Sequence, residues 1–257
     1  MQHHFHFHLH HHARHHARYD VDMTQGSTTR HLINFALPLL AGNLFQQLYN
    51  MVDTWVVGNF VSNEAFSAVG TVTPIINTLI GFFLGMSSGA GVVISQYYGA
   101  HRPEKVHEAV HTAMLLTIVM GVVFTGVGIA MTPLMLELMK TPKDVLPLSS
   151  LYLRIYFLGI PGTIMYNFGA ALLRAFGDTK RPMLFLTISG IVNACLNLFF
   201  VIVCGMSVDG VATATVISQY ISLFLVVRCL RRSEGLSHLE LKSIRLDREE
   251  SLRMIQI

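Results

Sequence analysis

The amino-acid sequence predicts an all-α membrane protein, a bundle of six transmembrane helices. Of its 257 residues, 52% are hydrophobic and only 13% are charged, whereas a typical soluble domain has about 25% charged residues. A helix needs about 20 apolar residues to cross the ~30 Å of hydrocarbon in a bilayer. Six runs of at least 18 residues lack Asp, Glu, Lys and Arg: 32–52, 65–101, 109–136, 155–173, 182–208 and 210–227. Runs of this length and number exclude a soluble helical domain.

Each run is expected to form one helix. The predicted helices cover about 31–57, 65–98, 106–131, 148–175, 182–204 and 211–230. Pro38 predicts a kink in the first helix, because proline removes a backbone hydrogen bond. The glycines of the second helix, Gly81, Gly85 and Gly89, recur every four residues. This spacing predicts a flat surface for close helix packing.

The basic residues predict the orientation of the bundle. If the N-terminus is cytoplasmic, 15 Lys and Arg residues lie in cytoplasmic segments, and only Lys140, Lys143 and Arg154 lie on or near the external side. Positive charge accumulates on the cytoplasmic side of membrane proteins. We therefore expect a multi-pass protein of the inner (plasma) membrane with both termini in the cytoplasm. The net charge of +3 then reflects topology in a lipid environment, and no nucleic-acid partner is expected.

Both ends of the chain are expected to lie outside the bundle. The first 16 residues contain nine histidines, which could form a zinc or nickel tether. The sequence from Met23 onward already forms a complete entry to a first helix, which favours a tag-like, disordered extension over 1–22 or translation upstream of the true start. The predicted bundle covers 23–232. Residues 233–257 are charged and are expected to form a cytoplasmic segment, part of which could be an amphipathic surface helix.

A polar stripe is predicted on the first helix. It consists of Asn43, Gln46, Asn50 and Asp53, at spacings of three, four and three residues, which place them along one side of a helix. Lipid does not tolerate such a stripe, so these side chains are expected to line a cavity. Asp53 is the only carboxylate well inside a predicted span, and such residues usually serve an ion or proton pathway.

Two asparagines of the fifth helix are expected to lie near Asp53. Helical rise places Asp53 about 7.5 Å below the external end of its helix, and places Asn197 and Asn193 about 12 Å and 18 Å below theirs. Asn193 and Asn197 are four residues apart and share a face. A carboxylate and two carboxamides are suitable ligands for a proton or a hard cation such as sodium. We therefore predict a cation or proton site at Asp53, Asn193 and Asn197.

The sequence contains no motif of enzymatic chemistry. GxxxxGK[ST], HExxH and GxSxG patterns are absent. The three cysteines, Cys195, Cys204 and Cys229, show no metal-ligand spacing and are interpreted as packing residues. We expect neither ATP-driven pumping nor hydrolysis, and no cofactor or resident metal. The expected ion, H⁺ or Na⁺, is a transported species.

Four segments resemble bacterial transporters of the multidrug and toxin extrusion (MATE) family. They are Phe35–Thr54 (FALPLLAGNLFQQLYNMVDT), Ile94–Ala100 (ISQYYGA), Leu173–Pro182 (LRAFGDTKRP) and Gly210–Gln219 (GVATATVISQ). The resemblance covers about 23–257. It implies the N-terminal six-helix lobe of a twelve-helix antiporter that exports organic cations, including xenobiotics, in exchange for protons or sodium.

The resemblance also bears on the site and on the end of the chain. The family's helix-one aspartate falls on Asp53, and its helix-five polar residues fall on Asn193 and Asn197. Some members have an aspartate at the position of Asn197, so this site carries one charge. Residues 252–257 (LRMIQI) are similar in character to 30–35 (RHLINF), which suggests the start of a second unit. We therefore expect an inter-lobe segment truncated before a C-terminal lobe, or a second half that pairs with this one.

Two alternatives stay open at this point. A flippase for lipid-linked oligosaccharides would favour several cationic residues in the cavity, and the predicted spans offer only Arg154. An inactive fragment that inserts without transporting is the other alternative.

Overall fold

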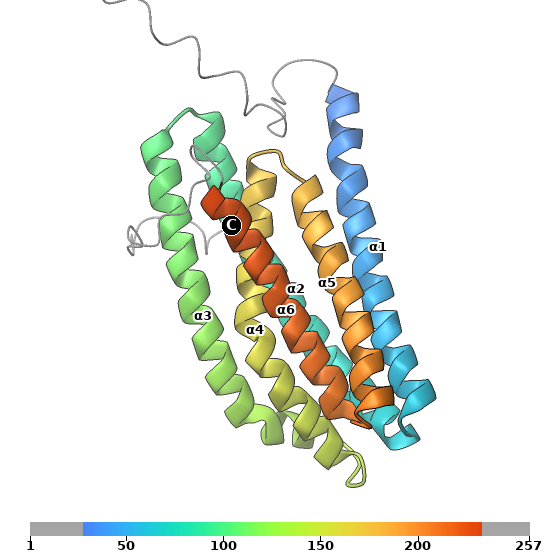
Figure 1. Cartoon of the computed structure of the whole chain (residues 1–257). Coiled ribbons are helices and arrows are strands. Elements are labelled where there is room, and N and C mark those ends of the chain that lie inside the picture. Colours follow the sequence, from blue (N-terminus) through green and yellow to red (C-terminus); the bar gives the residue numbers. More distant parts are fainter. Residues whose placement is uncertain (1–27, 233–257) are drawn as a thin grey trace, which may run out of the picture.

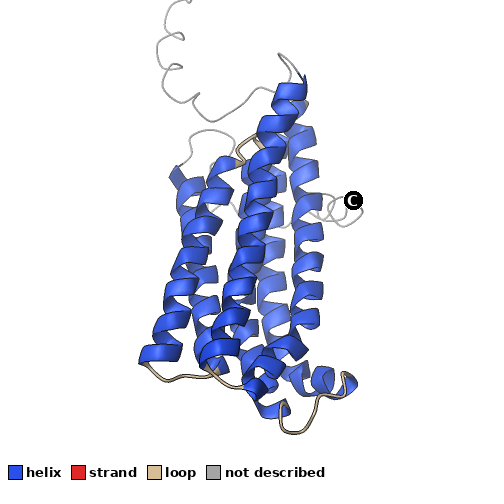
Figure 2. Cartoon of the chain, turned by 90° about the vertical axis from the view of Figure 1, so that its right-hand side faces the viewer, coloured by secondary structure: helices blue, strands red, loops and turns tan. Residues whose placement is uncertain are grey.

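The computed structural model describes residues 28–232. The predictions for 1–22 and for 233–257 lie outside the described residues. The described part consists of six α-helices and a π-helical segment: α1 Thr28–Phe60, α2 Asn63–Gly99, α3 Pro103–Leu138, α4 Leu146–Ala175, α5 Lys180–Leu198, η1 Phe199–Val203 and α6 Val208–Arg232. All the regular structure drawn in Figure 2 for these residues is helical.

The helices form one antiparallel bundle in which α4 is central. Short loops join successive helices, so the start of α1 and the end of α6 lie at the same end of the bundle, shown at the top of Figure 1. The most extensive contacts of α4 are with α6, α2 and α3, whereas α1 packs mainly on α5 and makes few contacts with α2. The margin between α1 and α2 is therefore loosely closed.

Among the described helices, five are long and apolar enough to cross a membrane: α2, α3, α4, α5 together with η1, and α6. Many large apolar side chains on the outside of the bundle are exposed, including Val122, Val203 and Phe224. Such a surface suits contact with lipid tails. The first helix is not among these five. The sixth span stays a prediction.

The central helix contains a proline whose missing hydrogen bond is replaced by its neighbours. Pro161 has no N–H to donate to the carbonyl of Phe157, one turn earlier. The hydroxyl of Thr125 on α3 lies 3.0 Å from this carbonyl and 2.8 Å from the carbonyl of Gly121 in its own helix, so its one hydrogen is shared between them. The next carbonyl, of Leu158, accepts a bond of 2.9 Å from the hydroxyl of Tyr220 on α6. Hydrogen bonds from α3 and α6 thus stabilise α4 at the turn before Pro161.

Replacing Thr125 with Val is expected to destabilise the bundle by roughly 0.6 kcal/mol, and at most about 1.7 kcal/mol, the range for interhelical hydrogen bonds within membranes. The Phe157 carbonyl would lose its bond to α3. Thermal or denaturant unfolding of the purified protein measures the change. Thr117→Val is the matched control, because Thr117 is buried on the same helix and bonds the carbonyl of Ala113 in its own helix. Equal losses in both variants would contradict a bridging role for Thr125.

Two predicted helix boundaries and one packing surface are wrong. The helix predicted to end at residue 131 continues to Leu138 through Pro133. The helix predicted over 182–204 ends at Leu198 and continues as the π-helix η1. Gly81 and Gly85 have open space around them, so they do not form the predicted packing surface. On α2 a close glycine contact occurs instead at Gly91, where an added Cβ would lie 3.3 Å from Ala171.

Candidate functional site

Three helices bring four polar side chains together in the interior of the bundle. Asp53 comes from α1, Asn193 and Asn197 from α5, and Thr215 from α6. The two asparagines are fully buried, and Asp53 is 6% exposed. Asn193 and Asn197 are one helical turn apart, so α5 presents both to the same neighbours. The juxtaposition expected from helix depth is present in the structure.

The four side chains form a closed hydrogen-bond network. The amide of Asn197 donates to one carboxylate oxygen of Asp53 and to Asn193 Oδ1 at 3.0 Å. The hydroxyl of Thr215 lies 3.4 Å from the other carboxylate oxygen and 3.0 Å from the carbonyl of Val211, so its one hydrogen is shared between these two acceptors. The amide of Asn193 lies 3.3 Å from Thr215 Oγ1. Asp53 therefore accepts two hydrogen bonds, the pattern of an ionised carboxylate.

No protein cation neutralises Asp53 in the described part of the chain. The ion pairs there join Lys105 to Glu108 and Arg181 to Asp178. One oxygen of the network, Asn197 Oδ1, is buried without a hydrogen-bond partner. A buried charge without a partner and a buried acceptor without a donor are both costly. A proton or a cation would satisfy both, whereas the described residues hold no His, Cys, Asp and Glu cluster suited to a transition metal.

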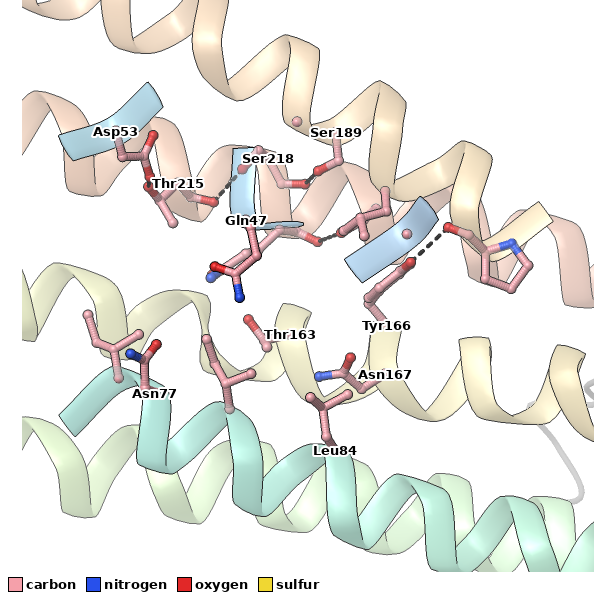
Figure 3. A pocket seen from close by; sticks show the side chains of 18 of the residues that line it. Gln47, Asp53, Asn77, Leu84, Thr163, Tyr166, Asn167, Ser189, Thr215 and Ser218 are labelled. Carbon is pink, nitrogen blue, oxygen red and sulfur yellow. Dashed lines mark hydrogen bonds between the residues drawn. The ribbon is translucent and has the colours of Figure 1, made fainter. Parts of the chain in front are cut away.

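A cavity of about 450 Å³ extends from this network along the inside of the bundle. It lies between α1 and α2, and its wall includes parts of α4, α5 and α6 (Figure 3). Most of its polar residues are uncharged. Among the described residues that line it, Asp53 is the only acid and Arg174 the only base. The cavity therefore has a mixed polar and apolar lining, with one negative and one positive group among its described residues.

The structure differs from the sequence prediction in the other cavity residues. The side chains of Asn43, Gln46 and Asn50 lie outside the described part of the structure, so their role as cavity-lining residues stays a prediction. On α1 it is Gln47 that lines the cavity, and the polar stripe did not include it. Thr215 was also missed, since a threonine within an apolar run resembles a packing residue. Arg154 is exposed and does not line the cavity, whereas Arg174 does.

A family model, MatE, matches residues 38–199. This match covers more than half of the chain and includes the Asp53 network except for Thr215. The chain belongs to the MATE family. The "Probable multidrug resistance protein YpnP" of Bacillus subtilis is 31% identical over 80% of this chain and 47% of its own length. YoeA of the same organism, also named a probable multidrug resistance protein, is 33% identical over 80% of this chain and 45% of its own length.

Solved structures show the same MATE fold. A MOP superfamily transporter from Pyrococcus furiosus has a TM-score of 0.84 at 23% identity, over 93% of this chain and 53% of its own. An outward-facing multidrug resistance MATE transporter has a TM-score of 0.81 at 24% identity, over 90% of this chain and 51% of its own. MATE proteins are multi-pass inner-membrane transporters rather than enzymes. The present chain spans about half the length of these MATE relatives.

Proposed function

We propose that this chain is the N-terminal lobe of a secondary antiporter that exports organic cations in exchange for H⁺ or Na⁺. The observation that carries the proposal is the buried carboxylate of Asp53, which has no cationic partner among the described residues. An ionisable residue within a membrane bundle usually marks an ion or proton path. The names of the relatives YpnP and YoeA, both multidrug resistance proteins, support the class of substrate.

Proton binding would change the hydrogen bonds between three helices. An ionised Asp53 accepts bonds from Asn197 and Thr215. A protonated Asp53 has a donor of its own and needs an acceptor. The unpartnered Asn197 Oδ1 can fill this role once its amide turns. Because Asp53 is on α1 and its partners are on α5 and α6, loading the site would alter how α1 packs, which is a means of coupling ion binding to a conformational change.

Sodium would use the same oxygen atoms. The carboxylate of Asp53, the amide oxygens of Asn193 and Asn197 and the hydroxyl of Thr215 are hard ligands. Together they carry one full negative charge, and no basic side chain of the described residues forms an ion pair with it. Either ion can therefore occupy the network, and the two would compete for one site.

A complete transport cycle is proposed to need a second lobe, which is either a C-terminal lobe or a second half that pairs with this one. In vesicles that contain this chain alone, a second copy of the chain would take that place. The cavity is loosely closed between α1 and α2, so a facing lobe can complete the wall around an organic cation. We propose that the described helices belong to a lobe over 23–232, followed by an inter-lobe segment over 233–257. We also propose that both termini lie in the cytoplasm, because this orientation matches the distribution of Lys and Arg.

Everted membrane vesicles containing the chain test the proposal. A cationic dye such as ethidium is supplied outside. In separate runs the vesicle interior is made acidic or is loaded with sodium, so that H⁺ or Na⁺ can leave as the dye enters. We expect dye to enter the vesicles in response to one of the two gradients and to leave when that gradient is collapsed by an ionophore. Dye movement that ignores both gradients, with the protein inserted, would contradict antiport by this chain.

A further inference from the structure

The central helix presents a polar stripe to the cavity over its whole length. Residues 152, 156, 163, 167 and 174 all line the cavity, at spacings of four and seven that place them on one face of α4. They are Tyr152, Tyr156, Thr163, Asn167 and Arg174. The stripe begins beside Asp53 and ends at the α4–α5 loop, the end of the bundle that the charge pattern predicts to be cytoplasmic.

Arg174 is the only base among the described residues that line the cavity, and none of the described residues neutralises its charge. It is half-buried on the cavity wall, and no ion pair or hydrogen bond among the described residues involves its guanidinium group. The group that interacts with it electrostatically is Tyr166, whose hydroxyl donates a hydrogen bond of 2.8 Å to the carbonyl of Pro182. Half-buried arginine without a partner is unusual, because a guanidinium has five donors to satisfy.

The neighbouring loop shows how such a charge is normally neutralised. Asp178 contacts Arg181 Nε at 3.1 Å and accepts the backbone N–H groups of Lys180 and Arg181 at 3.1 Å each. The carboxylate of Asp178 therefore caps α5 and pairs with Arg181. Among residues 28–232, no acid plays this part for Arg174, which is on the other side of the same loop.

The positive and negative charges of the cavity act separately. Asp53 lies close enough to Tyr156 to interact with it electrostatically, and Arg174 follows Tyr156 by 18 positions, or about 27 Å along a helix. This separation is far greater than the contact distance of an ion pair, at which two opposite charges neutralise each other. The two charged groups cannot neutralise each other, so each is available to a different ligand group.

We propose that Arg174 forms an anion subsite in the transport cavity, which binds a phosphate or carboxylate group. Asn167 is two turns from Arg174 on the same face and lines the cavity. Its side chain has no hydrogen bond among the described residues, so its amide can donate to the same ligand. Ile80, Leu84 and Leu186 provide apolar walls, which suits an amphiphilic molecule with one anionic group. The subsite thereby widens the proposed substrate class from cations to molecules that carry an anionic group. It rests on the cavity of the proposed transporter but not on the ion-binding role of Asp53.

Riboflavin 5′-phosphate and riboflavin are a suitable pair of probes, because they differ only in the phosphate. Equilibrium dialysis against the whole chain in phosphatidylcholine nanodiscs measures the affinity for each. We expect the phosphorylated probe to bind about tenfold more tightly, the scale of one charge-assisted hydrogen bond. Arg174→Gln should remove this preference and Arg174→Lys should retain part of it. Equal affinities for the two probes in the unmodified chain, or an intact preference in Arg174→Gln, would overturn the proposal.

Two control variants and a change of lipid separate the possible causes. Arg154→Gln removes the same charge from the same helix at an exposed position, and this variant should keep the preference for the phosphorylated probe. If Arg154→Gln loses as much of this preference as Arg174→Gln does, the effect is one of general charge and the subsite is rejected. Asp53→Asn should also keep it, so failure of the proposed antiport and failure of this subsite are distinguishable. Phosphatidylglycerol added to the discs should compete with the phosphorylated probe if lipid head groups are a source of the anion, and should leave its affinity unchanged if the subsite takes soluble anions.

Discussion

Replacing Asp53 with Asn is expected to reduce gradient-driven dye transport to background. Asparagine has nearly the same shape: its amide oxygen can still accept the hydrogen bond from Asn197, and its NH2 group can donate to the hydroxyl oxygen of Thr215. It cannot bind a proton near neutral pH and carries no charge to hold sodium. The variant should therefore insert and fold like the unmodified chain while ion binding no longer drives exchange. Dye movement in everted vesicles under imposed pH and sodium gradients measures the effect.

Asp144→Asn provides the matched control for this experiment. Asp144 is an exposed residue just before α4, and its replacement removes the same charge outside the network. This variant should transport at the original rate. If Asp53→Asn transports as well as Asp144→Asn at equal protein levels, Asp53 is not the coupling residue.

Replacing Gly128 with Ala is expected to destabilise the bundle by about 1–3 kcal/mol, the usual cost of overpacking a core. A Cβ at this position would lie 2.1 Å from Cε1 of Phe157. Phe157 is fully buried at the interface of α3 and α4, so its ring has little space to move. Thermal unfolding of the purified protein should show a lower midpoint.

Gly126→Ala is the control, because it is two residues away on the same helix and has nothing within 4 Å of the added carbon. Alanine also has a higher helix propensity than glycine, so this variant should be as stable as the original or slightly more stable. A Gly128→Ala protein as stable as Gly126→Ala would mean that α3 and α4 are not closely packed at this point.

The bundle could be predicted because the free energy of insertion depends on local composition. Long runs without charged residues indicated the positions of all six α-helices. The hydropathy of such a run is calculated from its own residues, so it can be found without knowing which helices pack against it. The π-helix η1 could not be predicted in this way. Its geometry depends on packing against the start of α6, where a Cβ on Gly210 would lie 2.7 Å from Met206 and 3.1 Å from Phe200. Such contacts leave no periodic signal in the sequence.

The site was predictable in part for similar reasons. Asp53 is conspicuous as a carboxylate in an apolar run, and the spacing of Asn193 and Asn197 indicated a shared face. Thr215 gave no signal, because its hydroxyl also bonds the carbonyl of Val211 in its own helix, as buried threonines commonly do. Arg174 was counted only as a basic residue at a helix end, since its place on the cavity wall depends on how α4 rotates within the bundle.

Infrared difference spectroscopy of the purified chain tests the central claim most directly, because it reports the protonation of a buried carboxyl group without requiring transport. The protein is compared before and after acidification, and before and after addition of sodium, with Asp53→Asn treated identically. The account predicts a protonated-carboxyl band that appears on acidification, is suppressed by sodium if sodium competes for the site, and is missing in Asp53→Asn. A band that persists unchanged in Asp53→Asn, or no titrating carboxyl band at all in the unmodified chain, would contradict it.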